Sequence, residues 1–272
     1  MSTASDLVAQ GDPEAALVEL QKEVRAKAAD PKLRVFLFQL LCVLGQWPRA
    51  LNQLKVCGEL DAGALAMVNT YREAVQCEAV RESVFAGKTL PHVFGKPQAW
   101  VALLAQALQV EAAGDSRGAH RLRQQAMEEA PVSSGQLNAQ PFEWIADADS
   151  RLGPVLEAVI NGRYCWVPFS ALSKAKFDAP EDLRDLVWLP AHLELANGGE
   201  VVALVPSRYP GSGMEPDALL RMARKTEWVE MAEGQYRGLG QRMLITSTAE
   251  VGLLDARDLT LVPSATGTDA TA

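Results

Sequence analysis

The 272-residue sequence predicts an α+β protein, with an N-terminal α-helical repeat part followed by a mostly β part. Two observations support this division. Long apolar segments joined at glycines fill the first half of the chain, and the same residue types recur there at a fixed spacing. Short β-favouring runs separated by turn residues follow from about residue 135. The predicted domains are therefore a helical repeat domain at 1–134, a mostly β domain at 135–262 and a disordered tail at 263–272.

The clearest helical hairpin begins with the segment 33–44, which contains only two polar residues. A helix that is apolar on nearly every side is expected to pack on more than one side. Gly45 is predicted to end this helix, because glycine readily adopts the left-handed conformation found at helix ends. Pro48 then suits the first turn of the next helix. Ala50 is a small residue placed where the two helices would cross closely.

An earlier hairpin matches this one at an offset of 34 residues, which is the tetratricopeptide period. The matching pairs are Leu7 and Leu41, Gly11 and Gly45, Ala16 and Ala50, Leu17 and Leu51, and Leu20 and Leu54. A fainter third copy, the predicted hairpin of 99–113 and 117–130, repeats the turn at Gly114-Asp115 and the small residue at Ala119. The segment 64–85 instead predicts a long amphipathic helix that breaks the strict repeat. The spacing favours a tetratricopeptide-like repeat, and the alternative is a set of unrelated helical hairpins built from common residues.

Stacked helical hairpins form concave surfaces that bind peptides or helices. Aligning the turn glycines of the second and third copies assigns candidate contact residues to such a groove, and one more comes from the helix between them. Each of these side chains could instead belong to the core. The candidates for binding a partner helix are Val35, Gln39, Cys42, Tyr71, Leu104 and Leu108.

The second half of the chain reads as short strands. Asn161-Gly162 is a strong hairpin signal between 155–160 and 164–168, because both turn positions favour positive φ. Gly238-Leu-Gly240 is interpreted as a turn between strands. Further predicted strands are 186–189, 201–205, 243–246 and 259–262, and a helix is predicted at 217–225.

Composition excludes several classes of function. The net charge of −8 leaves no basic half of the chain, so nucleic-acid binding is not expected. No apolar run is long enough to span a membrane, and no signal peptide is recognisable, so a cytoplasmic location is expected. The four cysteines lack metal-like spacing and are interpreted as buried free thiols.

Catalytic signals are weak. The sequence has no phosphate-binding loop of the usual type, and its three histidines are scattered, so neither a metal nor a cofactor is expected. One alternative of another class stays open, in which a polar site in the β domain serves an enzyme or binds a small ligand. Its candidate residues are Asp147, Asp149, Arg208 and Arg242.

Several blocks of the sequence, in order, resemble one known family. They include Asp147-Ala-Asp-Ser-Arg-Leu-Gly-Pro, Ser207-Arg-Tyr-Pro-Gly-Ser and Gly238-Leu-Gly-Gln-Arg, and further blocks lie at 37–50, 84–91 and 183–190. These blocks are similar to the ImpE family, also called TagJ, of accessory proteins in bacterial type VI secretion. The resemblance spans roughly residues 5–262.

The resemblance implies a cytoplasmic, non-enzymatic adaptor with a tetratricopeptide-like N-terminal part. Members of the family are associated with the small subunit of the contractile sheath, TssB, and with sheath recycling by the ClpV ATPase. The expected partner is therefore a TssB-like subunit, with an N-terminal helix as one form of contact, and a ClpV-type ATPase is an indirect partner. The resemblance supplies no catalytic residues.

Overall fold

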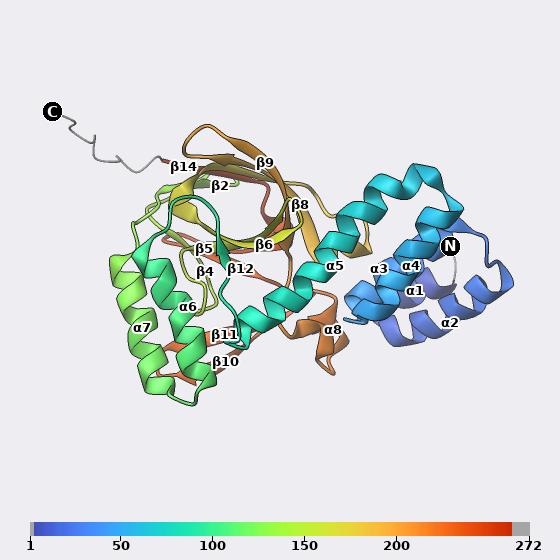
Figure 1. Cartoon of the computed structure of the whole chain (residues 1–272), viewed down its shortest axis with the longest axis horizontal. Coiled ribbons are helices and arrows are strands. Elements are labelled where there is room, and N and C mark those ends of the chain that lie inside the picture. The colour runs from blue at the N-terminus through green and yellow to red at the C-terminus, as the bar shows by residue number, and fades with distance from the viewer. Residues whose placement is uncertain (1–2, 263–272) are drawn as a thin grey trace.

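The computed structural model describes residues 3–262, and the predicted tail at 263–272 lies outside them. Helices dominate the first half and strands the second, so the predicted α+β class is confirmed (Figure 1). No helix within 3–262 is both long and apolar enough to cross a membrane. The helices are α1 (Thr3–Gln10), α2 (Pro13–Ala26), α3 (Pro31–Val43), α4 (Trp47–Leu60), α5 (Leu65–Phe85), α6 (Ala99–Ala112), α7 (Ser116–Glu129) and α8 (Ala218–Arg221).

The first four helices form the two predicted hairpins. The turn glycines Gly11 and Gly45 have φ values of +88° and +64°, a region that glycine enters without steric cost. Asp30 begins α3, since its carboxylate accepts hydrogen bonds from two backbone amides of the first turn. Ala16 and Ala50 are both completely buried, so the two copies use the same small residue where their helices pack.

A third hairpin, α6–α7, turns at Gly114 with φ +88° and does not stack on the first two. The 21-residue helix α5 separates them, and α6–α7 lies at the opposite end of that helix (Figure 1). The strict repeat therefore ends after two copies, because α5 continues where a turn would be needed.

The strands form one large sheet and two small ones. The large sheet has the order β1-β6-β5-β9-β8-β7-β14-β2-β3, and the small ones are β10-β11 and β13-β12-β4. The strands are β1 (His92–Val93), β2 (Gly135–Leu137), β3 (Gln140–Phe142), β4 (Ile145–Asp147), β5 (Val155–Ile160), β6 (Arg163–Pro168), β7 (Leu172–Phe177), β8 (Trp188–Leu195), β9 (Glu200–Pro206), β10 (Thr226–Ala232), β11 (Gln235–Gly240), β12 (Met243–Thr246), β13 (Glu250–Gly252) and β14 (Asp258–Leu261).

The predicted hairpin at Asn161-Gly162 joins β5 to β6, with φ values of +49° and +70°. The interpretation of Gly238-Leu-Gly240 as a turn is wrong, because these residues lie in β11. A Cβ at Gly238 would lie 2.2 Å from the Tyr209 ring, and one at Gly240 would lie 1.9 Å from the Lys225 carbonyl oxygen. These glycines let neighbouring segments approach a strand closely.

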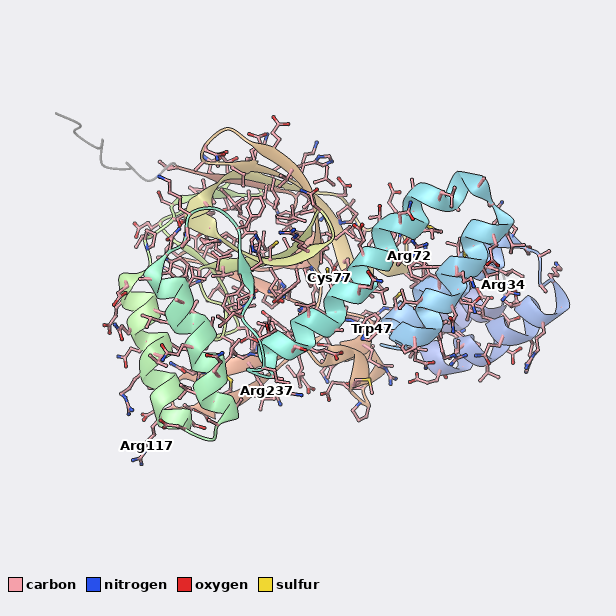
Figure 2. The ribbon with its side chains drawn as sticks, viewed as in Figure 1. Arg34, Trp47, Arg72, Cys77, Arg117 and Arg237 are labelled. Atoms are coloured by element: carbon pink, nitrogen blue, oxygen red, sulfur yellow. The ribbon has the colours of Figure 1, made fainter. Side chains whose placement is uncertain are left out.

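Helices and strands share a buried apolar cluster. It contains residues of α1–α7 together with Trp166 and Trp188 of the sheet, and a second cluster fills the other side of the sheet. On α5, the Cys77 thiol lies 3.4 Å from the Gly162 carbonyl oxygen at the β5–β6 turn (Figure 2). Residue 134 is thus where helices give way to strands, while the packing continues across it.

Candidate functional site

A groove opens along one face of α3, and we call it the hairpin groove. It encloses about 390 Å³. Five of its lining residues share one face of α3 at helical spacing, and the others come from α4 and the α4–α5 connection. Its lining residues are Pro31, Lys32, Val35, Phe36, Gln39, Cys57, Asp61 and Ala64. Two of the six predicted contact residues, Val35 and Gln39, therefore line an open groove.

Cys42 lies further along α3 and Tyr71 lies on α5, and both are covered by the chain itself. The Tyr71 ring is 6% exposed and lies between the rings of Phe38 and Trp188, at centroid distances of 5.9 and 6.1 Å. The Arg184 guanidinium lies 4.7 Å from the Tyr71 ring centroid. The short helix η3 (Leu183–Leu186) and the start of β8 therefore occupy the surface over these two residues.

Leu104 and Leu108 are buried on α6, at 1% and 4% exposure. Because α6 lies at the far end of α5, the structure does not bring these leucines to Val35 and Gln39 (Figure 1). The six candidates thus occupy three places in the fold. The α3 pair lines the hairpin groove, Cys42 and Tyr71 lie beneath η3, where Tyr71 borders a separate pocket, and the two leucines are buried on α6.

Two residues of the alternative polar site, Asp147 and Arg242, converge in a buried charge network between α5 and the sheets. Arg242 is completely buried and pairs with both Asp147 and Glu157. Arg81 of α5 binds the same Glu157 carboxylate through two nitrogens, at 2.7 and 3.0 Å. Arg81 also approaches Glu78 at 3.4 Å. Buried charges are tolerated where each finds opposite charge and hydrogen bonds, and this network meets that condition.

The network sets the protonation of its carboxylates. Burial alone would raise the pKa of Glu157, but the charges and hydrogen bonds of Arg81 and Arg242 outweigh it and lower this pKa to about 2. Asp147 is a contrasting case. Its burial raises the pKa to about 6, and the opposing charge of Arg242 reduces the effect only in part.

Asp149 and Arg151 form a separate buried ion pair in the connection between β4 and β5. The Asp149 carboxylate accepts hydrogen bonds from Arg151 at 2.6 and 2.9 Å, and from the Gly238 amide at 3.0 Å. The Asp149 carboxylate thereby joins the segment between β4 and β5 to β11.

Arg208 is buried and binds carbonyl oxygens. It donates hydrogen bonds to Cys42 and Val43 at the end of α3, and to Arg221 at the end of α8. A cation at a helix C-terminus stabilises the carbonyl groups left unpaired there. Burial lowers the pKa of Arg208 to about 10, and the nearby charge of Glu78 opposes this shift.

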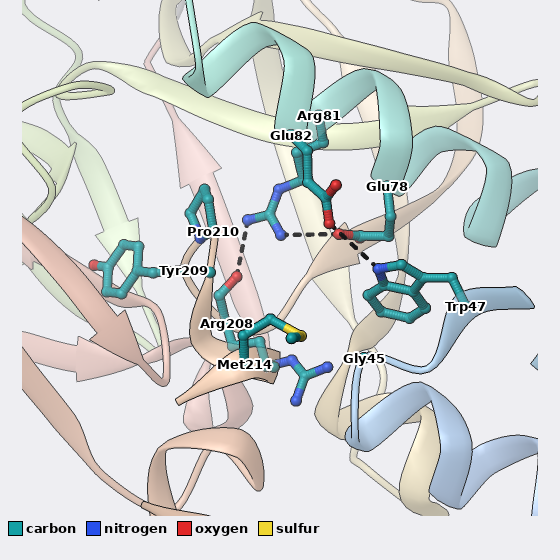
Figure 3. Close-up of a pocket in the computed structure, with 11 residues that line it drawn as sticks. Gly45, Trp47, Glu78, Arg81, Glu82, Arg208, Tyr209, Pro210 and Met214 are labelled. Atoms are coloured by element: carbon teal, nitrogen blue, oxygen red, sulfur yellow. Dashed lines mark hydrogen bonds and ion pairs between the residues drawn. The ribbon is translucent and has the colours of Figure 1, made fainter. Parts of the chain in front are cut away.

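A small pocket lies between Arg81 on one side and Arg208, Met214 and Gly45 on the other, with Trp47 beside it (Figure 3). It encloses about 30 Å³, roughly the space of a single water molecule. Pockets for small-molecule substrates are on the order of 300–1,000 Å³. The polar side chains around it therefore bind one another and leave too little room for such a ligand here.

Sequence reasoning missed Glu78, Arg81 and Glu157, which are three of the five residues of the network. A signal existed in Glu157, a lone charged residue inside the apolar run of β5. Such a residue in a buried strand requires a partner from elsewhere in the chain. No cluster of His, Cys, Asp and Glu that could hold a metal ion occurs in residues 3–262.

Comparison with known proteins assigns the chain to a family. A family model described as ImpE protein matches residues 139–260. The type VI secretion system accessory component TagJ of Pseudomonas aeruginosa is 50% identical over 261 residues, which cover 96% of this chain and 92% of that protein. A crystal structure of a Vibrio parahaemolyticus protein has the same fold, with a TM-score of 0.88 at 24% identity, over 97% of this chain and 99% of that one. On the strength of the 50% identity along nearly its whole length, this chain belongs to the ImpE/TagJ family.

Proposed function

We propose that this chain is a non-enzymatic adaptor of the bacterial type VI secretion system. The supporting observation is its identity with an accessory component of that system across nearly the full length of both proteins. The partners we propose are a helix of the TssB-like small sheath subunit and, indirectly, the ClpV-type ATPase that recycles the sheath. The cytoplasm is the location that fits these partners, and four buried free thiols suit a reducing compartment.

The hairpin groove is the surface that we propose for the sheath helix. Val35, Phe36 and Ala64 give the groove an apolar floor. Leu60 and Leu65, which flank the lining residues Asp61 and Ala64 in the sequence, are 41% and 48% exposed. An amphipathic helix binds such a groove by laying its i, i+3, i+4 and i+7 side chains into it. Exposed apolar area beside a groove of this kind favours a helix over a small polar ligand.

Within this proposal, Val35 and Gln39 contact the partner, while Cys42, Tyr71, Leu104 and Leu108 hold the scaffold. Gln39 marks the boundary between the two roles. It is 7% exposed, it lines the groove, and it lies on the helix that packs against the covering helix η3. A partner helix would therefore lie over the first half of α3 and end where η3 begins.

The buried charge network supports the non-enzymatic part of the proposal. Asp147, Arg208 and Arg242 each have protein partners, and the adjoining pocket is of water size. A catalytic acid or base must reach its substrate within hydrogen-bond distance. The network instead joins the helices to the sheets.

The test is calorimetric titration of the full-length chain with a synthetic peptide of the amphipathic helix from a TssB-like sheath subunit. Val35→Asp should weaken binding at least about tenfold, because it buries an unpaired carboxylate in the groove. Val132→Asp is the matched control, since Val132 is 72% exposed and lies outside the groove. Equal affinities for the two variants would reject this placement of the site. Failure of the peptide to bind the unmodified chain would reject the proposed partner.

A further inference from the structure

A second groove lies on the β part, between the β10–β11 hairpin and the sheet containing β12, and we call it the aromatic groove. It encloses about 290 Å³ and is lined by Ala148, Trp228, Tyr236, Ile245 and Glu250. It belongs neither to the buried charge network nor to the hairpin groove, which lies on α3 and α4.

Two aromatic side chains form one wall of the aromatic groove. Trp228 and Tyr236 are 42% and 40% exposed, which is unusual for aromatic side chains that have a nearby core to enter. Strand pairing places Trp228 opposite Gly238 and Glu230 opposite Tyr236. Cross-strand partners and alternate residues share a face of a two-stranded sheet, so Trp228, Glu230 and Tyr236 all face the same side.

The wall is held in place before any ligand binds. The Trp228 ring packs against the buried Tyr209 ring at a centroid distance of 5.6 Å. Two hydrogen bonds to Ser150 hold the Tyr236 backbone. The Tyr236 amide donates to the Ser150 hydroxyl at 3.0 Å, and the Tyr236 carbonyl oxygen accepts from the Ser150 amide at 2.9 Å. A preformed wall loses little conformational freedom on binding.

The charge beside these rings is negative and unpaired. Glu250 lines the groove, and Glu230 shares the face of the two rings. Neither carboxylate forms an ion pair or hydrogen bond with any residue in the range 3–262. The basic residues nearest to Glu230 in sequence are committed elsewhere, since Lys225 pairs with Glu227 and Asp217, Arg224 binds backbone carbonyl groups of α1, and Arg237 lies on the other face of the hairpin. Arg257, the nearest to Glu250, binds the carbonyl oxygens of Leu254 and Ala256.

Aromatic faces with adjacent carboxylates attract cations, and arginine stacks on such rings more often than lysine. We propose that the aromatic groove binds an arginine side chain presented by a basic segment of a protein partner. The guanidinium would stack on the rings of Trp228 and Tyr236 and pair with Glu250. The acidic rim disfavours nucleic acids and anionic lipid surfaces, whose phosphates it would repel.

The experiment measures the affinity of the full-length chain for a dye-labelled synthetic peptide of alternating arginine and serine, by fluorescence anisotropy. A second peptide carries citrulline in place of arginine, which keeps the shape and removes the charge. Tyr236→Leu and Glu250→Gln should each raise the Kd about threefold, the scale of an exposed cation–π contact or ion pair. Citrulline should raise the Kd about tenfold.

Glu233→Gln is the control for the overall negative charge of the chain, because Glu233 is exposed in the turn of the same hairpin and outside the groove lining. It should leave the Kd unchanged within error. The proposal is overturned by any of three results: no measurable binding of the arginine peptide, equal binding of the citrulline peptide, or equal losses in Glu233→Gln and Glu250→Gln. These variants leave the hairpin groove intact, so binding of a sheath helix there is tested separately.

Discussion

The Arg208 guanidinium donates a hydrogen bond of 2.6 Å to the Val43 carbonyl oxygen, across 165 positions of the sequence. This bond joins the end of α3 to the segment after β9. The same guanidinium binds the Cys42 carbonyl oxygen at 2.8 Å. One buried side chain thus connects the second helical hairpin to the β part of the molecule.

Arg208→Lys is therefore expected to destabilise the whole chain. An ammonium group is a compact donor that cannot reach carbonyl groups on both α3 and α8, and the carbonyls left unpaired remain buried. The free energy of unfolding should fall by about 2–4 kcal/mol. Urea unfolding followed by circular dichroism measures this change. Arg117→Lys is the control, because Arg117 points away from the molecule at the tip of α6–α7 (Figure 2) and should leave the midpoint unchanged.

Ala50→Leu tests the packing between the repeated helices. Ala50 is completely buried, so the added carbon atoms would overpack the contact and lower the free energy of unfolding by about 1–3 kcal/mol. Ala102→Leu makes the same change on the exposed side of α6 and should be nearly neutral. Equal melting temperatures for the two variants would contradict the assigned helix crossing.

The free energy of unfolding should decrease at acidic pH, because Glu157 becomes protonated there. Its folded pKa of about 2 lies below its ordinary value of 4.5, so the folded state binds fewer protons than the unfolded state between these values. The stability that Glu157 contributes is therefore fully present above about pH 4.5 and is lost as the pH falls toward 2. Denaturant unfolding at several pH values measures this loss.

Glu157→Gln removes the titrating group and should flatten that part of the pH profile. The variant is also less stable at neutral pH, because Arg81 and Arg242 lose their shared carboxylate. The two proteins are therefore compared by how steeply the free energy of unfolding changes with pH between 4.5 and 2. A variant slope as steep as that of the unmodified chain would assign the acid sensitivity to other carboxylates.

A fragment of residues 1–134 tests the predicted domain boundary. Without the β part, Tyr71 loses its contacts with Trp188 and Arg184, and part of the shared apolar cluster becomes exposed. We expect a helical fragment that melts with low cooperativity and binds a hydrophobic dye. A cooperative melt at the temperature of the full chain would instead establish 1–134 as an independent domain, as the change in sequence pattern predicts.

Local signals predicted the parts of the fold that local physics determines. Gly45 ends α3 because a left-handed residue is needed there, and Asn161-Gly162 forms a hairpin because both positions favour positive φ. Gly238 gave the opposite result. It looks like a turn residue locally, but it lies within β11. Glycine is required there because the Tyr209 ring, 29 positions away in sequence, occupies the space of a side chain.

The candidate site depended on contacts that no local pattern reports. Aligning the turn glycines placed Leu104 and Leu108 in one groove with Val35, but α5 runs on without a turn and carries the third hairpin away. Cys42 and Tyr71 were assigned to the correct helices, and their surface is covered by a segment more than 100 residues later. Val35 and Gln39 remain a prediction, now with a defined groove around them.

The cover over Tyr71 also closes part of the inner face of the repeat. Stacked helical hairpins expose a concave surface on which a peptide or a helix can bind. Here Tyr71 of α5 packs against Phe38 of α3, Trp188 packs on Tyr71, and η3 packs on α3. The β part of the same chain therefore fills this stretch of the concave surface as an internal ligand would, which leaves the hairpin groove as the stretch of α3 that is open to an outside helix.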